Sequence, residues 1–241
     1  MPGDVAGTDV YLNPAAVVVS MRGRNGWPGT KETAMGPNQS TTPRGHRGLD
    51  EARSLAATLP ERSLIELLDS TDRWHQPAYA GSEILPGLYQ GGTEDDDVVQ
   101  VAAYGHRVAS DTPYDVFVTL YASAQPAPWG VEELRYGFYD DALEGPDIAR
   151  VIRAARFAYQ RWTDGDTVLI RCQAGLNRSG LVTALVLVMA GLSPAQAIAL
   201  IRERRSSGAL FNEHFVRWLL EDGETAAAAA RQISPSVQRA A

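Results

Sequence analysis

The residues of this chain that could do chemistry together lie in one short stretch. Cys172, the only cysteine, follows an apolar β-branched run, and Arg178 and Ser179 come just before a second apolar run over residues 181–190. The first run is typical of a buried strand and the second of a buried helix, so Cys172 is predicted at a strand end, just before a helix begins. A helix N-terminus and a nearby guanidinium both favour the thiolate over the thiol. The stretch therefore predicts a nucleophilic sulfur.

A short loop is predicted between this strand and this helix, with Gly175 giving it the backbone freedom to curl around a ligand. Its residues are Gln173, Ala174, Gly175, Leu176 and Asn177. A strand, a curled loop and a helix N-terminus aim several backbone N–H groups at one point, as proteins do to bind phosphates. Arg178 adds a rigid fork of donors that fits two phosphate oxygens. We expect nucleophile and phosphate clamp to converge here, with the Ser179 hydroxyl able to hydrogen-bond the sulfur.

The arrangement of Cys172, five residues, Arg178 and Ser179 resembles the signature of the cysteine-dependent protein tyrosine phosphatases, and is similar above all to their compact dual-specificity branch. A motif counts only in its structural context, which the predicted strand and helix provide. The resemblance implies that Cys172 is the nucleophile, that Arg178 and the loop amides clamp the transition state, and that Ser179 assists thiolate departure. It implies no metal ion and no other cofactor.

One position departs from the family pattern. The family usually has His immediately before the cysteine, where this chain has Arg171, whose positive charge also suits a thiolate. The alternative interpretation of the motif is structural: Cys172 would be a small apolar residue at a strand end and Arg178 a solvated residue at a helix start. The glycine, the strand and the helix around the motif favour the catalytic interpretation.

A carboxylic acid is expected on a loop before the cysteine, because the family has one there. The leaving oxygen of a phosphate monoester must be protonated and a water later deprotonated, and one carboxyl can do both. Residues 133–140 alternate as a strand does, and Asp140 continues the period of Tyr136 and Phe138. The register favours Asp140 as this acid, with Asp141 as its rival. Both could also be loop acids without a role.

Composition limits the remaining functions. The chain has 241 residues with 44% hydrophobic content, enough for one ordinary domain with an appendage. Its net charge of -7 argues against general binding to nucleic acid or to an anionic membrane. One cysteine allows no intramolecular disulfide, and no Cys/His cluster suggests structural zinc. No early apolar run is long enough for a signal peptide or a membrane span, so a cytoplasmic location is expected.

Composition also divides the chain into four segments. Residues 1–48 are rich in Gly, Pro, Thr, Asn and Ser and are predicted to be a disordered tail. Residues 49–82 have helical spacing broken by Pro60, which predicts two short helices leading into the main domain. Residues 83–221 are predicted to be the catalytic domain, an α/β fold with a mixed, largely parallel central sheet flanked by helices. Residues 222–241 are predicted to be an alanine-rich tail that is dispensable.

Within the main domain, periodicity and capping residues predict a succession of elements. They are paired strands over 84–92, a helix capped by Thr93 with Asp96, strands over 115–121 and 133–140, an amphipathic helix over 147–162, and two helices after the buried one, capped by Ser193 and by Asn212, the last ending near Gly223.

The function that the resemblance implies is hydrolysis of a phosphate monoester through a phosphocysteine intermediate. Two other classes stay open: a module that binds phosphorylated partners without turnover, and a sulfurtransferase that uses the same cysteine. The variable loop positions Gln173, Leu176 and Asn177 include no cation, which argues against inositol lipids. Proteins phosphorylated on Tyr, Ser or Thr and small phosphorylated metabolites stay open as substrates.

Overall fold

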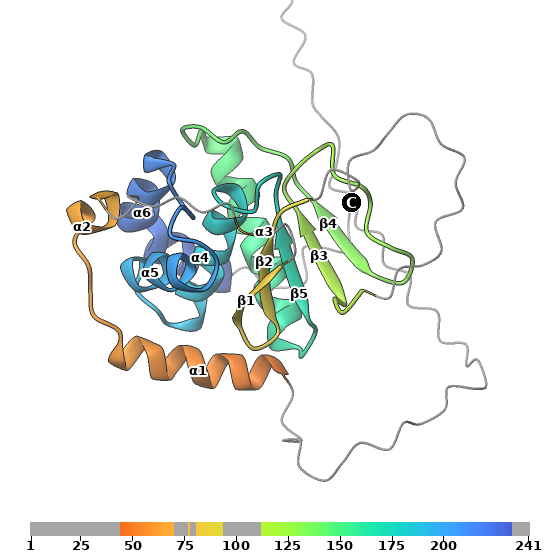
Figure 1. Cartoon of the computed structure of the whole chain (residues 1–241), viewed down its shortest axis with the longest axis horizontal. Helices are drawn as coiled ribbons and strands as arrows, with labels where there is room; N and C mark the ends of the chain where they lie inside the picture. Colours follow the sequence, from red (N-terminus) through yellow and green to blue (C-terminus); the bar gives the residue numbers. More distant parts are fainter. Residues whose placement is uncertain (1–43, 70–76, 78–80, 94–111, 233–241) are drawn as a thin grey trace, which may run out of the picture.

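The central feature of the fold is a sheet whose middle strand leads directly to Cys172. The computed structural model describes residues 44–69, 77, 81–93 and 112–232. In these ranges the strands are β1 (Ser82–Leu85), β2 (Leu88–Gly91), β3 (Val116–Thr119), β4 (Glu132–Arg135) and β5 (Val168–Arg171). Their order is β1-β2-β5-β3-β4 (Figure 1), and only the β1–β2 pair is antiparallel.

The register of the sheet places the candidate site at one edge. Arg171, the last residue of β5, lies opposite Gly91 at the end of β2 and Thr119 at the end of β3. Ligands of open α/β sheets bind beyond the carboxyl ends of parallel strands. All four residues of β5 are buried, as expected for the middle strand of such a sheet.

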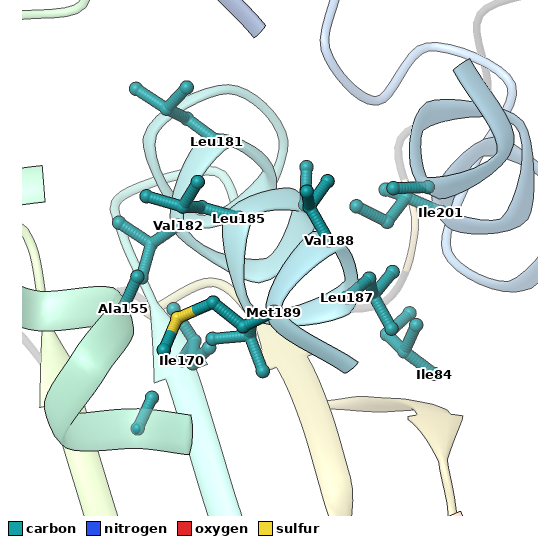
Figure 2. Packing of buried hydrophobic residues seen from close by; sticks show 14 of the residues in the cluster. Ile84, Ala155, Ile170, Leu181, Val182, Leu185, Leu187, Val188, Met189 and Ile201 are labelled. Carbon is teal, nitrogen blue, oxygen red and sulfur yellow. The ribbon is translucent and has the colours of Figure 1, made fainter. Parts of the chain in front are cut away.

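The helices of the described ranges are α1 (Arg44–Thr58), α2 (Leu64–Asp69), α3 (Gly145–Thr163), α4 (Arg178–Ala190), α5 (Pro194–Arg204) and α6 (Glu213–Gln232). Helix α4 is the centre of the core: it contacts α3, α5 and α6 as well as β2 and β5. Every residue of α4 after Arg178 is buried, as expected for a helix that is apolar on all sides. Figure 2 shows its side chains among residues of other elements, which include Ile84, Ala155, Ile170 and Ile201. The predicted fold class, a mixed and largely parallel sheet flanked by helices, is confirmed.

Local signals predicted most of these elements. Ser193 and Gln196 form the two reciprocal hydrogen bonds of a capping box at the start of α5. Asn212 accepts a hydrogen bond from the His214 N–H at the start of α6. Residues 1–43 of the predicted tail, the helix predicted after Thr93 with Asp96 in its first turn, and residues 233–241 fall outside the described residues.

The prediction that the last helix ends near Gly223 is wrong. Helix α6 continues to Gln232, and Ala226, Ala227 and Ala230 are buried in the core. Alanine has the highest helix propensity, and burial of one face outweighs the cost of a single internal glycine. Arg231 also donates a hydrogen bond to the Met189 carbonyl near the end of α4. The alanine-rich segment is therefore part of the packed fold as far as Gln232.

The strand predicted over 133–140 is also wrong in length, because β4 ends at Arg135. Its neighbour β3 ends at Thr119, whose carbonyl accepts the N–H of Tyr136, and no later ladder bond follows. Backbone groups beyond that point must bond elsewhere. The Phe138 carbonyl accepts a hydrogen bond from Arg178, so the chain leaves the sheet toward the candidate site.

The boundary predicted between tail and lead-in helices lies too late in the chain. Two helices separated at Pro60 are present, but α1 begins at Arg44, inside the predicted tail. Gly45 and Gly48 are buried against Trp162 of α3, where a Cβ would collide with Trp162 atoms at both positions. These glycines allow close helix packing, a use that a composition argument cannot distinguish from disorder. In the described part of the chain, no helix is both long enough and apolar enough to span a membrane.

We expect Gly45→Ala to lower the free energy of unfolding by about 1–3 kcal/mol, because backbone must shift to admit the new methyl group. A Cβ at this position would lie 1.8 Å from the Trp162 carbonyl oxygen. Gly145→Ala is the matched control, since a Cβ there meets nothing within 4 Å, and both changes reduce unfolded-state entropy alike. Urea unfolding followed by tryptophan fluorescence measures both. Equal stability of the two variants would show that α1 is not docked on α3.

Candidate active site

Cys172 lies where the sequence predicts it, between the end of β5 and the start of α4. Its backbone N–H bonds the Gly91 carbonyl, which continues the β2–β5 pairing by one residue. Its side chain is buried, and its Sγ lies 3.3 Å from the Oγ of Ser179 in the first turn of α4. A hydroxyl at this distance can donate to a thiolate, so Ser179 is placed for the assisting role predicted for it.

The loop between Cys172 and Arg178 turns its carbonyl groups outward. The Gln173 carbonyl accepts the Thr93 N–H at 2.9 Å, and the Leu176 carbonyl accepts the Leu210 N–H at 3.3 Å. A trans peptide places its carbonyl oxygen and the next N–H on opposite sides. The N–H groups that follow these carbonyls, those of Ala174 and Asn177, are therefore directed away from these partners, toward the concave side of the loop.

The Gly175 carbonyl is the most firmly held of the loop. It accepts hydrogen bonds from Nε2 of Gln90 at 3.0 Å and from Nε of Arg205 at 3.2 Å. By the same peptide geometry, the Leu176 N–H is directed into the loop. Gly175 has a φ of 71°, and a Cβ on it would lie 2.4 Å from the Gly91 carbonyl carbon. Only glycine fits this position.

Arg178 begins α4 and reaches across to the acid-bearing segment. Its Nη1 donates to the carbonyls of Leu120 and Phe138 at 3.3 and 3.4 Å, and its guanidinium lies 5.6 Å from the centre of the Tyr121 ring. Its Nε is buried and has no hydrogen-bond partner among the described residues. A buried guanidinium donor without a partner is costly, so it marks a position where an acceptor is expected.

Asp140 lies beside the loop, as predicted, but it is not part of a strand. Its Oδ2 accepts from Nδ2 of Asn177 at 3.1 Å, and its Oδ1 accepts from Nδ2 of Asn212 at 2.9 Å. Asp141 instead accepts the N–H of Ala142, within its own turn. The geometry favours Asp140 over its rival, and the catalytic role of either residue stays a prediction.

The Arg171 side chain is held by residues of the sheet and of the loop that follows β3. Arg171 is 3% exposed, donates from Nε to Oγ1 of Thr119 at 3.0 Å and lies 4.5 Å from the Phe117 ring centre. Its Nη2 bonds the Gln125 carbonyl and forms an ion pair with Glu133 at 3.4 Å. Glu133 in turn accepts from Thr119. Arg171 therefore joins β5 to β3, to β4 and to the loop that follows β3.

The sequence analysis missed Gln90 and Arg205, and it named Asn212 only as a helix cap. A buried glutamine inside the apolar β2 segment was the available signal for Gln90, since buried polar groups are hydrogen-bonded. Burial lowers the pKa of the Arg205 guanidinium, and the negative charge of an ionised Cys172 opposes that lowering. Arg205 therefore supports the shape of the loop and lies close enough to Cys172 for their charges to interact.

No group of three or more His, Cys, Asp or Glu side chains that could hold a metal ion occurs within the described ranges. The arrangement that does occur combines a buried thiol, a curled loop with inward N–H groups, a guanidinium and a carboxylate held at the rim. Such an arrangement can bind a phosphate group and transfer it to sulfur.

We expect Glu133→Gln to lower the free energy of unfolding by up to about 3 kcal/mol, because it removes the negative charge that pairs with the buried Arg171 and with the partly exposed Arg135. Glu132→Gln is the matched control: Glu132 pairs with the partly exposed Arg161, and we expect a loss of about 1 kcal/mol or less. Chemical unfolding measures both, and the double variant Arg171→Met with Glu133→Leu should regain most of the loss. Similar effects of the two glutamine variants would contradict a buried Arg171–Glu133 pair.

Comparison with known proteins shows which family part of this chain resembles. Residues 145–225, which include Cys172 and Arg178 but not Asp140, match the family model for the catalytic domain of dual specificity phosphatases. Dual specificity protein phosphatase 12 of Mus musculus is 33% identical over 144 residues, which are 58% of this chain and 40% of that protein. The chain thus matches less than half the length of this curated relative.

A solved structure shares the fold. A mouse protein described as a dual specificity phosphatase, complexed with zinc tungstate, superposes with a TM-score of 0.50 at 23% identity, covering 65% of this chain and 94% of that one. Human DUSP28 gives a TM-score of 0.49 at 23% identity, covering 64% of this chain and 99% of its own. With the cysteine, arginine and serine of the signature inside the matched residues, these comparisons support the predicted resemblance to the dual-specificity phosphatase branch of the protein tyrosine phosphatases.

Proposed function

We propose that this chain hydrolyses phosphate monoesters in two steps through a phosphocysteine intermediate, without a metal ion. The observation that carries the proposal is the convergence of uncommitted donors beside a buried thiol: the loop N–H groups opposite three bonded carbonyls, and the Nε of Arg178. The first turn of α4 adds to them, since its N-cap residue Asn177 makes no side-chain cap. A phosphate bound there would place phosphorus next to Sγ of Cys172.

In the first step the Cys172 thiolate attacks phosphorus, so an S–P bond forms while the P–O bond to the leaving group breaks. Arg178 and the loop N–H groups hydrogen-bond the three oxygens over which the transition-state charge is spread. Asp140 in its acid form gives its proton to the departing oxygen, and an alcohol or phenol leaves. The hydrogen bonds of Asp140 to Asn177 and Asn212 support this role by fixing the carboxyl at the loop.

In the second step a water molecule attacks the phosphocysteine. The Asp140 carboxylate now takes a proton from the water, whose oxygen forms the new bond to phosphorus. The S–P bond breaks, the electron pair returns to sulfur, and the Ser179 hydroxyl at 3.3 Å stabilises the departing thiolate with a hydrogen bond. Inorganic phosphate is released and Asp140 is again an acid.

The substrate class that we propose is a protein phosphorylated on Tyr, Ser or Thr. The curated relative is named as a protein phosphatase, and the loop positions Gln173, Leu176 and Asn177 offer no cation for additional phosphates of an inositol lipid. We also propose a cytoplasmic location. A reducing compartment keeps the single Cys172 as a thiol, and the mechanism needs it in that form.

We expect Cys172→Ser to lower kcat by about 10³-fold or more, because it removes the nucleophile. Binding of the phosphate analogue vanadate or tungstate should persist, since the loop amides and Arg178 remain. A chromogenic aryl phosphate, assayed with and without a chelator, measures turnover, and calorimetry measures binding. Turnover near the wild-type rate would rule out the covalent mechanism, and loss of wild-type activity in chelator would rule out metal independence.

We expect Asp140→Asn to lower kcat/KM about 10²-fold or more on alkyl phosphates, whose poor leaving groups need a proton, and less on an activated aryl phosphate. The basic limb of the pH profile of kcat/KM should also disappear. Asp141→Asn is the matched control and should be mild on both substrates. If Asp141→Asn showed the leaving-group dependence and Asp140→Asn did not, the two roles would have to be exchanged.

A further inference from the structure

Two large apolar side chains are exposed beside the candidate site. Among the described residues, Ile65, Trp129, Tyr139 and Phe211 are the large apolar side chains at the surface. Tyr139 is 85% exposed and directly precedes Asp140, and Phe211 is 50% exposed and directly precedes Asn212. Leaving a large aromatic ring in water forgoes about 1.5–3 kcal/mol of burial. The position of these two rings therefore calls for an explanation.

The residues on both sides of Tyr139 are hydrogen-bonded to the phosphate loop or to the helix start that follows it. The carbonyl of Phe138 accepts a hydrogen bond from Arg178, and the carboxylate of Asp140 accepts one from Asn177. Tyr139 thus stands between two residues that contact the loop, while its own ring stays in solvent. A ring presented from an anchored backbone loses little entropy when it binds a partner.

Phe211 is held in the same way. The Leu210 N–H bonds the Leu176 carbonyl, and the Asn212 N–H bonds Oδ1 of Asn177 at 3.1 Å. Leu210 adopts a φ of 56°, the only positive φ of a non-glycine residue in the described ranges. Backbone strain of this kind persists where the surroundings impose it, and it is frequent at binding sites. Here it buries Leu210 and leaves the next side chain at the surface.

One hydrogen bond joins the two anchored segments: Nδ2 of Asn212 donates to Oδ1 of Asp140 at 2.9 Å. The two rings therefore belong to residues next to this hydrogen bond, close along the chain to the carboxyl that the proposed reaction uses at the leaving oxygen. The group that carries that oxygen must extend past Asp140, and so it lies near the segments that bear Tyr139 and Phe211.

The charge of these segments limits what that group can be. Asp141, Glu144 and Glu213 are exposed on them, and Glu213 is paired only loosely with Arg217, at 3.6 Å. Acidic side chains repel a second phosphate or an acidic flank. An apolar or aromatic flank would instead be attracted to the two rings, which bury large area at low entropic cost.

On the basis of the proposed function, we propose that Tyr139 and Phe211 form the substrate-recognition surface, and that it takes a phosphopeptide with an apolar or aromatic residue next to the phosphorylated one. The rings contact the substrate outside the phosphate, so they set KM for peptides and leave phosphate binding unchanged. An acidic or multiply phosphorylated segment is a poor substrate.

The test compares two phosphopeptides that differ only in the neighbouring residues, leucine and phenylalanine in one and glycine in the other. We expect Tyr139→Ala and Phe211→Ala each to lower kcat/KM on the apolar peptide by about 3- to 10-fold, mainly through KM, as one aromatic contact contributes. On the glycine peptide the loss should stay below about 2-fold, and inhibition by vanadate should be unchanged. Tyr139→Phe should behave as the wild type.

Trp129→Ala is the matched control. Trp129 is also strongly exposed, and its removal should leave kcat/KM unchanged on both peptides. Equal losses on both peptides, weaker vanadate inhibition in the ring variants, or no loss on the apolar peptide would each overturn the inference. If the wild type cleaved neither peptide, the proposed function would fail separately. The surface would then be judged by calorimetry in the Cys172→Ser variant: ring-dependent binding of the apolar peptide would support it, and ring-independent binding would refute it.

Discussion

The candidate site depends on the orientation of one peptide group, the one that joins Gly175 to Leu176. Gln90 from β2 and Arg205 from the end of α5 both donate to its carbonyl oxygen. With the oxygen held outward, the N–H on the other side of the plane is available to an anion. If the peptide were reversed, a carbonyl would face the phosphate position and repel it. The positive φ of Gly175 and its close approach to Gly91 are consequences of this constraint.

The support of this peptide extends further than the sheet. Arg202 donates to the carbonyls of Ala209 and Leu210 and also to that of Leu67 in α2. Leu210 in turn bonds the phosphate loop through its N–H. Burial lowers the pKa of Arg202 to about 10, so it remains a cation at neutral pH. Helix α2, the second of the lead-in helices, is therefore connected through one buried arginine to the segment that shapes the loop.

What the sequence predicted well was local. A strand, a loop glycine, an arginine and a helix start follow one another within a few residues of Cys172, and the capping box at Ser193 is complete within three positions. The donors that hold the loop could not be predicted in this way, because Gln90 and Gly175 are 85 positions apart. Pairings of that kind are set by topology. The same limit explains the two misplaced boundaries at Arg44 and Gly223, where packing against distant residues decided the outcome and composition did not.

Asp140 lies beside the loop, as expected, but the strand from which its place was predicted does not reach it. The alternation from Leu134 to Phe138 was interpreted as a strand, and the burial of these two residues follows it. Yet β3, the neighbour of β4, ends at Thr119, and β4 ends at Arg135. The strand therefore does not extend to Asp140. The Arg178 guanidinium takes the Phe138 carbonyl, and two amides fix the carboxylate that follows. The residue that would clamp the phosphate thus also positions the segment that bears the acid, which couples the two halves of the proposed reaction. A change at Arg178 would disturb both, whereas a change at Asn212 would disturb the acid and the cap of α6 but would leave the clamp in place.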